Sequence, residues 1–363
     1  MVAGEASGDQ AAAAAVRSLR ALRPGWEVQA VGGRALAAAG AELLLPYEEV
    51  AVMGFTEVLA RLPAIHARLR RLRRLLAGGG VDLFMPVDFP GFNLRLAQTA
   101  RRAGVPVLYF VAPQVWAWGE GRVATLRRVV ERLAVILPFE ADWFGERGVD
   151  ARFVGHPIME SERPLAPDTP PPRLALLPGS RAQEVARHLP LMLAAASRLA
   201  AAVPGLECEL LESPALAPAY YDRLLAGASL LPERRREPSA GFLARQGAAL
   251  VASGTATLEV AAAGLPMAVV YRTGRLNYAL ARRLVRVSTI ALVNLVAGEE
   301  LVPELIQGDA TPEALAGAMA PLLAAGPARE RQRRGLLALR EALGGPGCGE
   351  RVARLAVELL EGA

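Results

Sequence analysis

RLALLPGSRAQEVARHLP, from Arg173 to Pro190, is the stretch that decides the fold of this chain. The apolar run Leu174–Leu177 has the length of a buried strand, and Pro178–Gly179 ends it. Ser180 then stands where the N-cap of a helix is expected, and apolar residues continue at helical spacing. The stretch therefore predicts a strand, a tight turn and a helix, which is the repeating unit of a parallel α/β sheet.

A turn of this kind is an anion site, because the free N–H groups at a helix N-terminus and the helix dipole point at the ligand. Gly179 and Ser180 supply the turn, and Arg181 adds a bidentate donor. A second turn, SGTATLE at 253–259, has the same pattern, with Ser253 or Thr255 as the expected cap. These features predict a nucleotide diphosphate held by helix dipoles and arginine.

Glu259 lies one turn into the second helix. Its carboxylate could accept hydrogen bonds from both hydroxyls of a ribose. The alternative is that Glu259 only complements the helix dipole. Gly254 lies in the same turn.

The composition excludes several classes of protein. With 363 residues, 53% hydrophobic and 21% charged, the chain can form two globular domains. No apolar run is long enough to span a membrane, and the N-terminus lacks the features of a signal peptide, so a cytoplasmic protein is expected. All 41 basic residues are arginine, which excludes Schiff-base and P-loop lysine chemistry. We expect no metal and no cofactor, because no Asp-x-Asp pair and no metal-ligand spacing occurs.

Strands alternate with helices along the whole chain, as in an α/β doubly wound parallel sheet. The proline-rich segment 161–172 is the expected linker between two Rossmann-like domains, 1–160 and 173–335. Helices at 336–363 are expected to pack on the first domain or on a partner chain, which leaves a homodimer open. Two such domains predict a cleft between them. The opening strand, two or three residues long, indicates either an upstream start or a trimmed sheet edge.

The first half carries polar residues just after strand ends, where open parallel sheets bind ligands. Asp88 ends the expected strand 81–88 and is a candidate general base; the alternative is a turn aspartate before Pro90. The remaining candidates for the acceptor or sugar are Glu5, Ser7, Asp9, Trp116 and His156, for which helix capping and ordinary packing are the alternatives.

The segment 53–76 combines apolar residues at helical spacing with many arginines. It predicts either a surface helix that covers one face of a sheet or a helix that rests on an anionic membrane. The candidate membrane contacts are Met53, Phe55, Arg68, Arg70, Arg71, Arg73 and Arg74. The calculated pI of about 9.7 favours an anionic partner, but no nucleic-acid-binding motif occurs, so we expect no nucleic acid.

Taken in order, several strings resemble the lipid-A-disaccharide synthase family: VAGEASGD, AVMGFTEVL, VDFPGFN, VAPQVWAW, LPFE, FVGHP, LLPGSRAQE, SGTATLE and VYR, with NLVAG and LVPELIQ near the end. The resemblance implies a metal-independent inverting glycosyltransferase of the GT-B type. It implies UDP-2,3-diacylglucosamine as donor, 2,3-diacylglucosamine 1-phosphate as acceptor, and a peripheral position at the inner leaflet of the inner membrane.

The family's essential aspartate and arginine match Asp88 and Arg181, and its nucleotide motifs match Ser253, Gly254, Thr255, Glu259 and Asn294. Two positions depart from the pattern. Gly91 stands where an acidic residue is common, and Val293 stands where proline is usual. Two alternatives remain at this point: another UDP-sugar enzyme of the same fold, such as a UDP-N-acetylglucosamine epimerase or a lipid-intermediate N-acetylglucosaminyltransferase, or a non-catalytic protein of the membrane surface.

Overall fold

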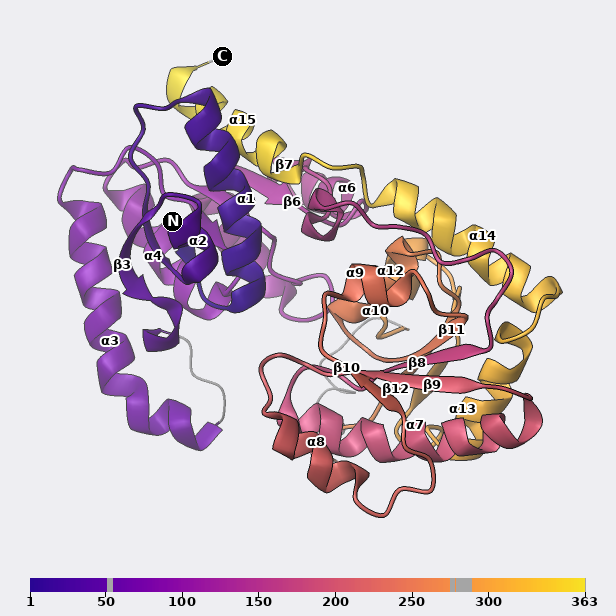
Figure 1. The fold of residues 1–363 in the computed structure, drawn as a ribbon. Coiled ribbons are helices and arrows are strands. Elements are labelled where there is room, and N and C mark those ends of the chain that lie inside the picture. The colour runs from indigo at the N-terminus through magenta and orange to yellow at the C-terminus, as the bar shows by residue number, and fades with distance from the viewer. Residues whose placement is uncertain (51–54, 275–277, 279–288, 363) are drawn as a thin grey trace. The chain divides into compact units, whose positions relative to one another are not determined.

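The computed structural model describes residues 1–50, 55–274, 278 and 289–362, and in 55–62 only the backbone. The chain divides into two compact units (Figure 1). Unit 1 comprises Met1–Glu160 and Leu343–Ala363, and unit 2 comprises Ser161–Ala342. Each unit is described by itself.

Unit 1 is a seven-stranded parallel sheet in the order β3-β2-β1-β4-β5-β6-β7. Its strands are β1 (Val2–Ala3), β2 (Gln29–Gly32), β3 (Glu42–Pro46), β4 (Pro86–Val87), β5 (Leu108–Phe110), β6 (Arg132–Val135) and β7 (Ala151–Phe153). Its helices are α1 (Ala6–Leu22), α2 (Arg34–Ala38), α3 (Phe55–Ala77), α4 (Pro90–Arg102), α5 (Val123–Val129), α6 (Glu140–Gly145) and α15 (Cys348–Glu361).

The two residues of β1 point to opposite faces of the sheet and belong to different hydrophobic cores, as strand geometry requires. Val2 packs with leucines of α3 and α4, whereas Ala3 packs with the alanines of α1 and with α15. The expected strand 81–88 is wrong in length: β4 has two residues, preceded by a single bridge from Phe84 to Val107. The ladder is short because β1, its partner, offers only Val2 and Ala3 for pairing.

Unit 2 is a six-stranded parallel sheet in the order β10-β9-β8-β11-β12-β13. Its strands are β8 (Arg173–Leu177), β9 (Glu207–Leu211), β10 (Glu233–Arg235), β11 (Ala248–Ala252), β12 (Met267–Tyr271) and β13 (Glu304–Ile306). Its helices are α7 (Ala182–Ala202), α8 (Pro218–Leu225), α9 (Ser239–Leu243), α10 (Thr255–Ala262), α12 (Leu292–Ala297), α13 (Pro312–Met319) and α14 (Pro327–Ala342).

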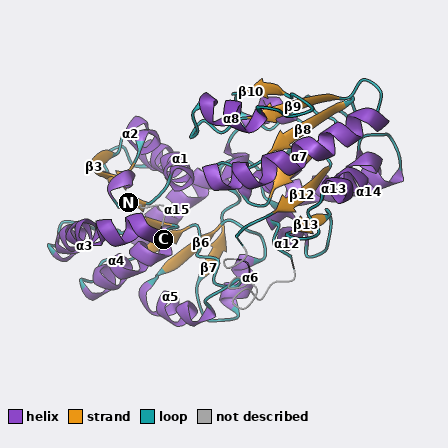
Figure 2. Ribbon diagram, turned by 90° about the horizontal axis from the view of Figure 1, so that it is seen from below, coloured by secondary structure: helices purple, strands orange, loops and turns teal. Residues whose placement is uncertain are grey.

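Helices cover both faces of the second sheet (Figure 1), and Figure 2 views this sheet from the side of α7 and α8. The helices α7, α8 and α13 bury a leucine-rich core on one face, while α10, α12 and α14 lie together on the other. The helix α14 continues through residue 335, where the sequence suggested a boundary, because Leu336 and Leu339 extend its buried stripe. Unit 2 therefore ends at Ala342.

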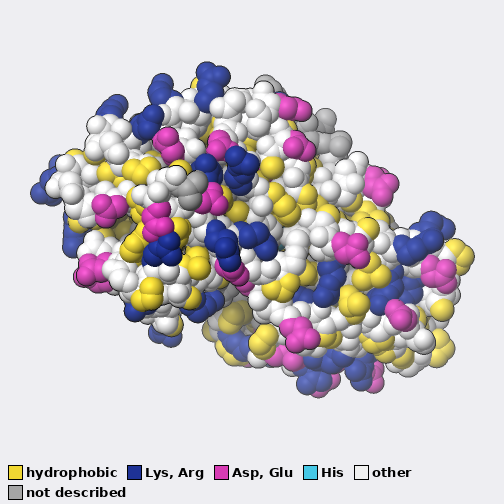
Figure 3. Space-filling view, turned by 90° about the horizontal axis from the view of Figure 1, so that it is seen from above, with side chains coloured by type: hydrophobic (Ala, Val, Ile, Leu, Met, Phe, Trp, Pro, Cys, Tyr) yellow, Lys and Arg dark blue, Asp and Glu magenta, His cyan; other side chains and the backbone are white. Residues whose placement is uncertain are grey.

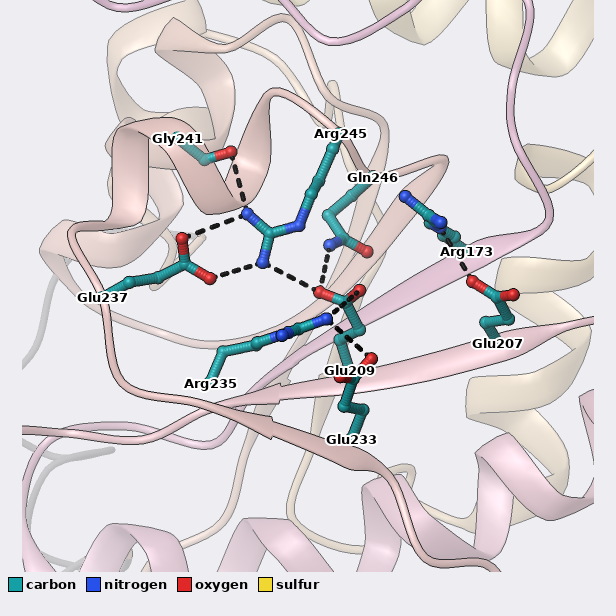
Figure 4. A network of polar contacts seen from close by, with 9 residues as sticks. All are labelled: Arg173, Glu207, Glu209, Glu233, Arg235, Glu237, Gly241, Arg245 and Gln246. Atoms are coloured by element: carbon teal, nitrogen blue, oxygen red, sulfur yellow. Dashed lines mark hydrogen bonds and ion pairs between the residues drawn. The ribbon is translucent and has the colours of Figure 1, made fainter.

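Two buried polar clusters stabilise unit 2 away from the turns that follow its strands. The Glu209 carboxylate, 2% exposed, meets Arg245 at 3.1 Å, Gln246 at 2.9 Å and Arg235 at 3.6 Å (Figure 4). Arg329 donates to the carbonyl oxygens of Gly247 and Leu322 and to that of Pro167 in the expected linker. A buried charge is tolerated where it has such partners.

Candidate functional site

The strand order in each sheet creates one switch point. On either side of this point the chain adds successive strands outward, towards opposite edges of the sheet. In unit 1 this point lies between β1 and β4, and in unit 2 between β8 and β11. Ligands of open parallel sheets bind at the carboxyl ends of the strands at such points. Glu5 and Asp88 follow the two switch-point strands of unit 1, and the two Gly/Ser turns follow those of unit 2.

Asp88 follows β4 directly and is held in an unusual backbone conformation. Asp88 and Phe89 have φ values of 46° and 51°, in the left-handed region. For residues other than glycine this region costs about 1–2 kcal/mol each. The Asp88 carbonyl oxygen accepts hydrogen bonds of 2.7 Å from Asn93 Nδ2 and from the Tyr109 hydroxyl, and its N–H donates to the Phe110 carbonyl. Such strain is found mainly at functional sites.

The electrostatic environment of Asp88 suits a general base. Burial, reinforced by the negative charge of Glu5, raises the pKa of the Asp88 carboxyl to about 6, while a backbone hydrogen bond from Phe89 opposes the shift. An acid of this pKa is ionised at neutral pH, yet it is basic enough to accept a proton from an alcohol as that alcohol reacts.

Trp116 also lies at this edge, bonded to a carboxylate that the sequence analysis did not assign. Its indole Nε1 donates to Glu140 Oε1 at 3.0 Å, and its ring meets Phe139 edge-on. Glu140 begins α6, is 1% exposed and also accepts from the N–H groups of residues 136 and 137. Burial above all, with the charge of Asp88 among the lesser causes, raises the pKa of Glu140 to about 7. Its position just after β6, in LPFE, was the signal available in the sequence.

The other acceptor candidates in unit 1 make hydrogen bonds within the protein. The Ser7 hydroxyl donates to Glu5 Oε1 at 2.7 Å, and both residues are exposed. Asp9 is buried and caps α2, since its carboxylate accepts from the N–H groups of Gly33, Ala35 and Leu36. His156 is buried, and its Nδ1 accepts from the N–H of residue 158.

In unit 2, the turn after β8 has the predicted strand, turn and helix, but its cap is different. The N-cap of α7 is Arg181, not Ser180, and the Glu184 carboxylate reaches back from the helix to the N–H groups of Ser180 and Arg181. Its Oε2 lies 3.3 Å and 3.4 Å from the backbone nitrogens of Ser180 and Arg181, and its Oε1 lies 3.0 Å from Arg181 Nη1. Gly179, with φ of 112°, has no room for a side chain beside Glu184. The turn therefore holds an anionic group with backbone N–H and guanidinium donors.

The turn after β11 leaves its helix without a side-chain cap. The N-cap of α10 is Gly254, so the expected cap by Ser253 or Thr255 is wrong. The Ser253 hydroxyl instead donates to the carbonyl oxygen of Ile290 at 3.1 Å. Glu259 lies one turn further into α10 and is half-buried.

His188, which the sequence analysis did not assign to this site, joins the turn after β8 to the segment after β12. The ring is 1% exposed; Nδ1 lies 2.9 Å from the Pro178 carbonyl oxygen, and Nε2 accepts from the N–H of Arg272 at 3.0 Å. An acceptor at Nε2 places the proton on Nδ1. Burial lowers the pKa of His188, in keeping with a neutral ring.

The Asn294 side chain links α12 to the segment 302–304 by hydrogen bonds. Its Nδ2 donates to Glu304 Oε1 at 2.7 Å and to the Val302 carbonyl, and its Oδ1 accepts from the Val302 N–H. Glu304 in turn accepts from the N–H groups of Ile290 and Ala291. Both ends of the side-chain amide thus bond to protein groups. Through Glu304 the amide positions residues 290 and 291, and the Ser253 hydroxyl bonds to the first of these.

The expected membrane segment is largely α3. Leu69, Leu72 and Leu76 pack into the sheet, so the helix does cover one face of it. Arg70, Arg71 and Arg74 are exposed on the same helix, while Arg68 pairs with Glu49 and Arg73 is half-buried. Met53 lies outside the described residues, and of Phe55 only the backbone is described, as the first residue of α3.

Arginine is not confined to this helix. On the face drawn in Figure 3, arginine side chains lie among acidic ones rather than in a single patch. On this face the positive charge is therefore interspersed with negative charge.

One cavity of unit 1 lies away from the expected site. It measures about 660 Å³ and lies at the opposite edge of the sheet, lined by Met1, Trp26, Leu83 and Leu360 among others. Among the described residues, no group of three or more His, Cys, Asp or Glu side chains is arranged to hold a metal ion. Within the same ranges, no helix is both long and apolar enough to cross a bilayer.

Residues 1–348 match the family model described as Lipid-A-disaccharide synthetase. The lipid-A-disaccharide synthase of Myxococcus xanthus (strain DK1622) is 42% identical over 372 residues, covering 99% of this chain and 97% of that protein. The chain belongs to the lipid-A-disaccharide synthase family. The enzyme of Anaeromyxobacter dehalogenans (strain 2CP-C) is 44% identical, with 97% of this chain and 95% of that protein covered.

Membership of this family makes the chain a glycosyltransferase of lipid A biosynthesis, as the resemblance implied. Among solved structures, the glycosyltransferase of kitacinnamycin has a TM-score of 0.64 at 19% identity, and the match covers 98% of this chain and 97% of that one. This likeness confirms the predicted fold class, an α/β protein of two doubly wound domains of the GT-B type.

Proposed function

We propose that the chain transfers 2,3-diacylglucosamine from UDP to the 6-hydroxyl of 2,3-diacylglucosamine 1-phosphate. The products are UDP and the β-1,6-linked disaccharide 1-phosphate. The family supports this reaction, and the observation that carries the assignment of the site is the Asp88 carboxyl. It lies at a switch point of the sheet with a pKa raised to about 6.

Asp88 accepts the proton of the acceptor 6-hydroxyl while its oxygen forms the bond to the anomeric carbon of the donor. The bond from that carbon to the diphosphate breaks, and the diphosphate leaves with the electron pair. Unit 1 thus supplies the base. Such a base contributes roughly 10²–10⁴-fold to the rate.

Unit 2 neutralises the leaving diphosphate. The donors are the Arg181 guanidinium, the N–H groups at the start of α7 and those at the start of α10, which have no side-chain cap. The Glu184 carboxylate already accepts from the N–H groups of Ser180 and Arg181, which supports an anion-binding role for this turn. A phosphate oxygen takes the place of this carboxylate when the donor binds. Glu259 accepts from the ribose hydroxyls.

The reaction is tested by incubating the protein with both lipids in detergent and EDTA and following disaccharide and UDP. Asp88→Asn lowers kcat by roughly 10²–10⁴-fold because it removes the base. Arg181→Gln lowers kcat by roughly 10²-fold because it removes charge from the leaving group. Asp82→Asn is the control, since this exposed aspartate precedes the same strand at its other end. Full turnover by Asp88→Asn, or turnover only after metal is added, contradicts the mechanism.

We also propose that α3 docks unit 1 on an anionic membrane, because both substrates carry acyl chains. Exposed Arg70, Arg71 and Arg74 lie beside Leu75, which is 41% exposed. Leu44, Arg71, Leu72, Arg74 and Leu75 line a shallow hollow there. A basic and apolar surface of this kind suits an anionic headgroup region.

Replacing Arg70, Arg71 and Arg74 together by glutamine lowers the affinity for phosphatidylglycerol vesicles, measured by cosedimentation, roughly 100-fold, at about 1 kcal/mol per arginine. Turnover of substrates dispersed in detergent stays unchanged. The same change at Arg17, Arg331 and Arg334, exposed on other helices, leaves vesicle binding intact. Equal loss in both triple variants contradicts docking through α3.

A further inference from the structure

Two buried side chains hold the backbone of Asp88 without belonging to the expected reaction. Asn93 and Tyr109 are both 0% exposed. Each donates a 2.7 Å hydrogen bond to the Asp88 carbonyl oxygen, Asn93 from α4 and Tyr109 from β5. That oxygen belongs to the first of two consecutive residues with left-handed φ. The bonds therefore fall where the backbone is strained.

The orientation of the Asn93 amide follows from its surroundings. Nδ2 faces three carbonyl oxygens: that of Asp88, that of Val2 at 3.1 Å and that of Val87 at 3.3 Å. An amide oxygen in this position would be repelled by all three. The other end, Oδ1, is buried and has no hydrogen-bond partner among the described residues. The protein leaves this buried acceptor unsatisfied, which is unfavourable, and gains a donor to β1, β4 and the Asp88 turn.

The turn is confined on its other side by apolar contacts. The Phe89 ring lies so close to Gly4 that a side chain at residue 4 would overlap it. The same ring stacks on Phe92, with centroids 5.6 Å apart. Asp88 and Phe89 therefore cannot relax to an ordinary conformation without breaking the two hydrogen bonds or moving Phe89.

We propose that Asn93 and Tyr109 are positioning residues that hold the Asp88 backbone in its left-handed conformation and thereby direct the carboxyl to the acceptor hydroxyl. This inference rests on the proposed role of Asp88 as the base. A general base must lie within hydrogen-bond reach of the proton that it takes, so a small displacement of its carboxyl lowers the rate. Substrate binding does not depend on this displacement.

The test is Tyr109→Phe, which removes one hydroxyl and keeps the buried ring. We expect kcat to fall about 10–100-fold, KM for both lipids to change less than about twofold, and the acidic limb of the pH profile to move to lower pH. The last effect arises because a relaxed carboxyl gains water. Tyr221→Phe is the control: its ring is also 0% exposed, and its hydroxyl accepts from the Ser213 N–H in unit 2.

A double variant separates positioning from general stability. If Tyr109 acts through Asp88, adding Tyr109→Phe to Asp88→Asn leaves the residual rate unchanged. Asn93→Ala, checked for folding by circular dichroism, must likewise lower kcat alone and have no further effect in the Asp88→Asn background. It replaces Tyr109→Phe in the test if Tyr109→Phe does not fold. An unchanged kcat in a folded Tyr109→Phe, or a loss that persists in the Asp88→Asn background, overturns the inference. Full activity of Asp88→Asn itself would instead overturn the proposed function.

Discussion

At the scale of single residues, the unit 1 site contains two acids, Asp88 and Glu140, whose surroundings oppose ionisation. Burial acts most strongly on Asp88, and Glu5 adds to it. Glu140 is affected in the same direction, with Asp88 among the causes. An acid whose pKa is raised loses its base form as the pH falls through that pKa. The rate therefore falls below a pH of about 6, where Asp88 becomes protonated.

Glu5→Gln removes the negative charge that acts on Asp88, so the pKa of Asp88 falls. We expect the acidic limb of kcat/KM to move to lower pH by roughly half a unit, the effect of one partly screened charge. Glu27→Gln is the matched control, an exposed glutamate that precedes β2 rather than following β1. A limb that moves to higher pH, or moves equally in both variants, would show that Glu5 does not act on the base.

At the scale of elements, the unit 2 site depends on side chains that tie one turn to another. His188 joins the Pro178 carbonyl to the Arg272 N–H, and so fixes the turn after β8 against the segment after β12. A second chain of contacts runs from Ser253 through Ile290 and Glu304 to Asn294. The donors that we assign to the diphosphate are therefore positioned by groups that need not touch it.

His188→Leu leaves a buried carbonyl and an N–H without partners and costs about 2–4 kcal/mol of stability. We expect KM for the UDP-sugar to rise about tenfold as well, because the turn after β8 loses its support. Gln332→Leu is matched: Gln332 is buried, and it bonds both the N–H and the carbonyl of Met267 at the start of β12. Urea unfolding and initial rates should show a similar loss of stability in both variants, with a raised KM in His188→Leu alone.

At the scale of the whole molecule, the chain leaves unit 1 at residue 160 and returns to it at residue 343. The returning helix, α15, lies beside α1 (Figure 1). Their approach is close because α1 offers alanines and α15 a glycine: a Cβ on Gly349 would lie 2.6 Å from the carbonyl carbon of Ala14. The helix α15 thus completes the hydrophobic core of unit 1 that α1 covers.

Gly349→Ala should lower the stability of the protein by about 1–3 kcal/mol, since backbone rather than a flexible side chain must move. Gly317→Ala, on an exposed face of α13 where an added Cβ meets nothing within 4 Å, should raise stability by about 0.5–1 kcal/mol. Thermal unfolding of the two variants measures both effects. A Gly349→Ala variant as stable as the parent would mean that the contact between α1 and α15 is looser than described.

The sequence by itself determined the fold class and the two Gly/Ser turns, because these depend on local signals. Apolar runs of strand length, Gly-rich breaks and helical spacing act over a few residues, and they are legible at Leu174–Leu177 and at 253–259. The same local rules singled out Asp88, which ends a buried strand before a proline. They misplaced the helix caps, because the Glu184 carboxylate accepts from the N–H groups before α7, and the Ile290 carbonyl accepts from the Ser253 hydroxyl.

Only the tertiary structure decided which residues support these turns. Asn93 reaches the carbonyl of Val2, 91 positions away, and His188 reaches Arg272, 84 positions away. Asp9, a candidate for binding the acceptor substrate, instead accepts hydrogen bonds from N–H groups at the start of α2. No local pattern encodes such pairs, because hydrogen-bond partners are set by the order of the strands, and this order depends on how the whole sheet buries its apolar faces.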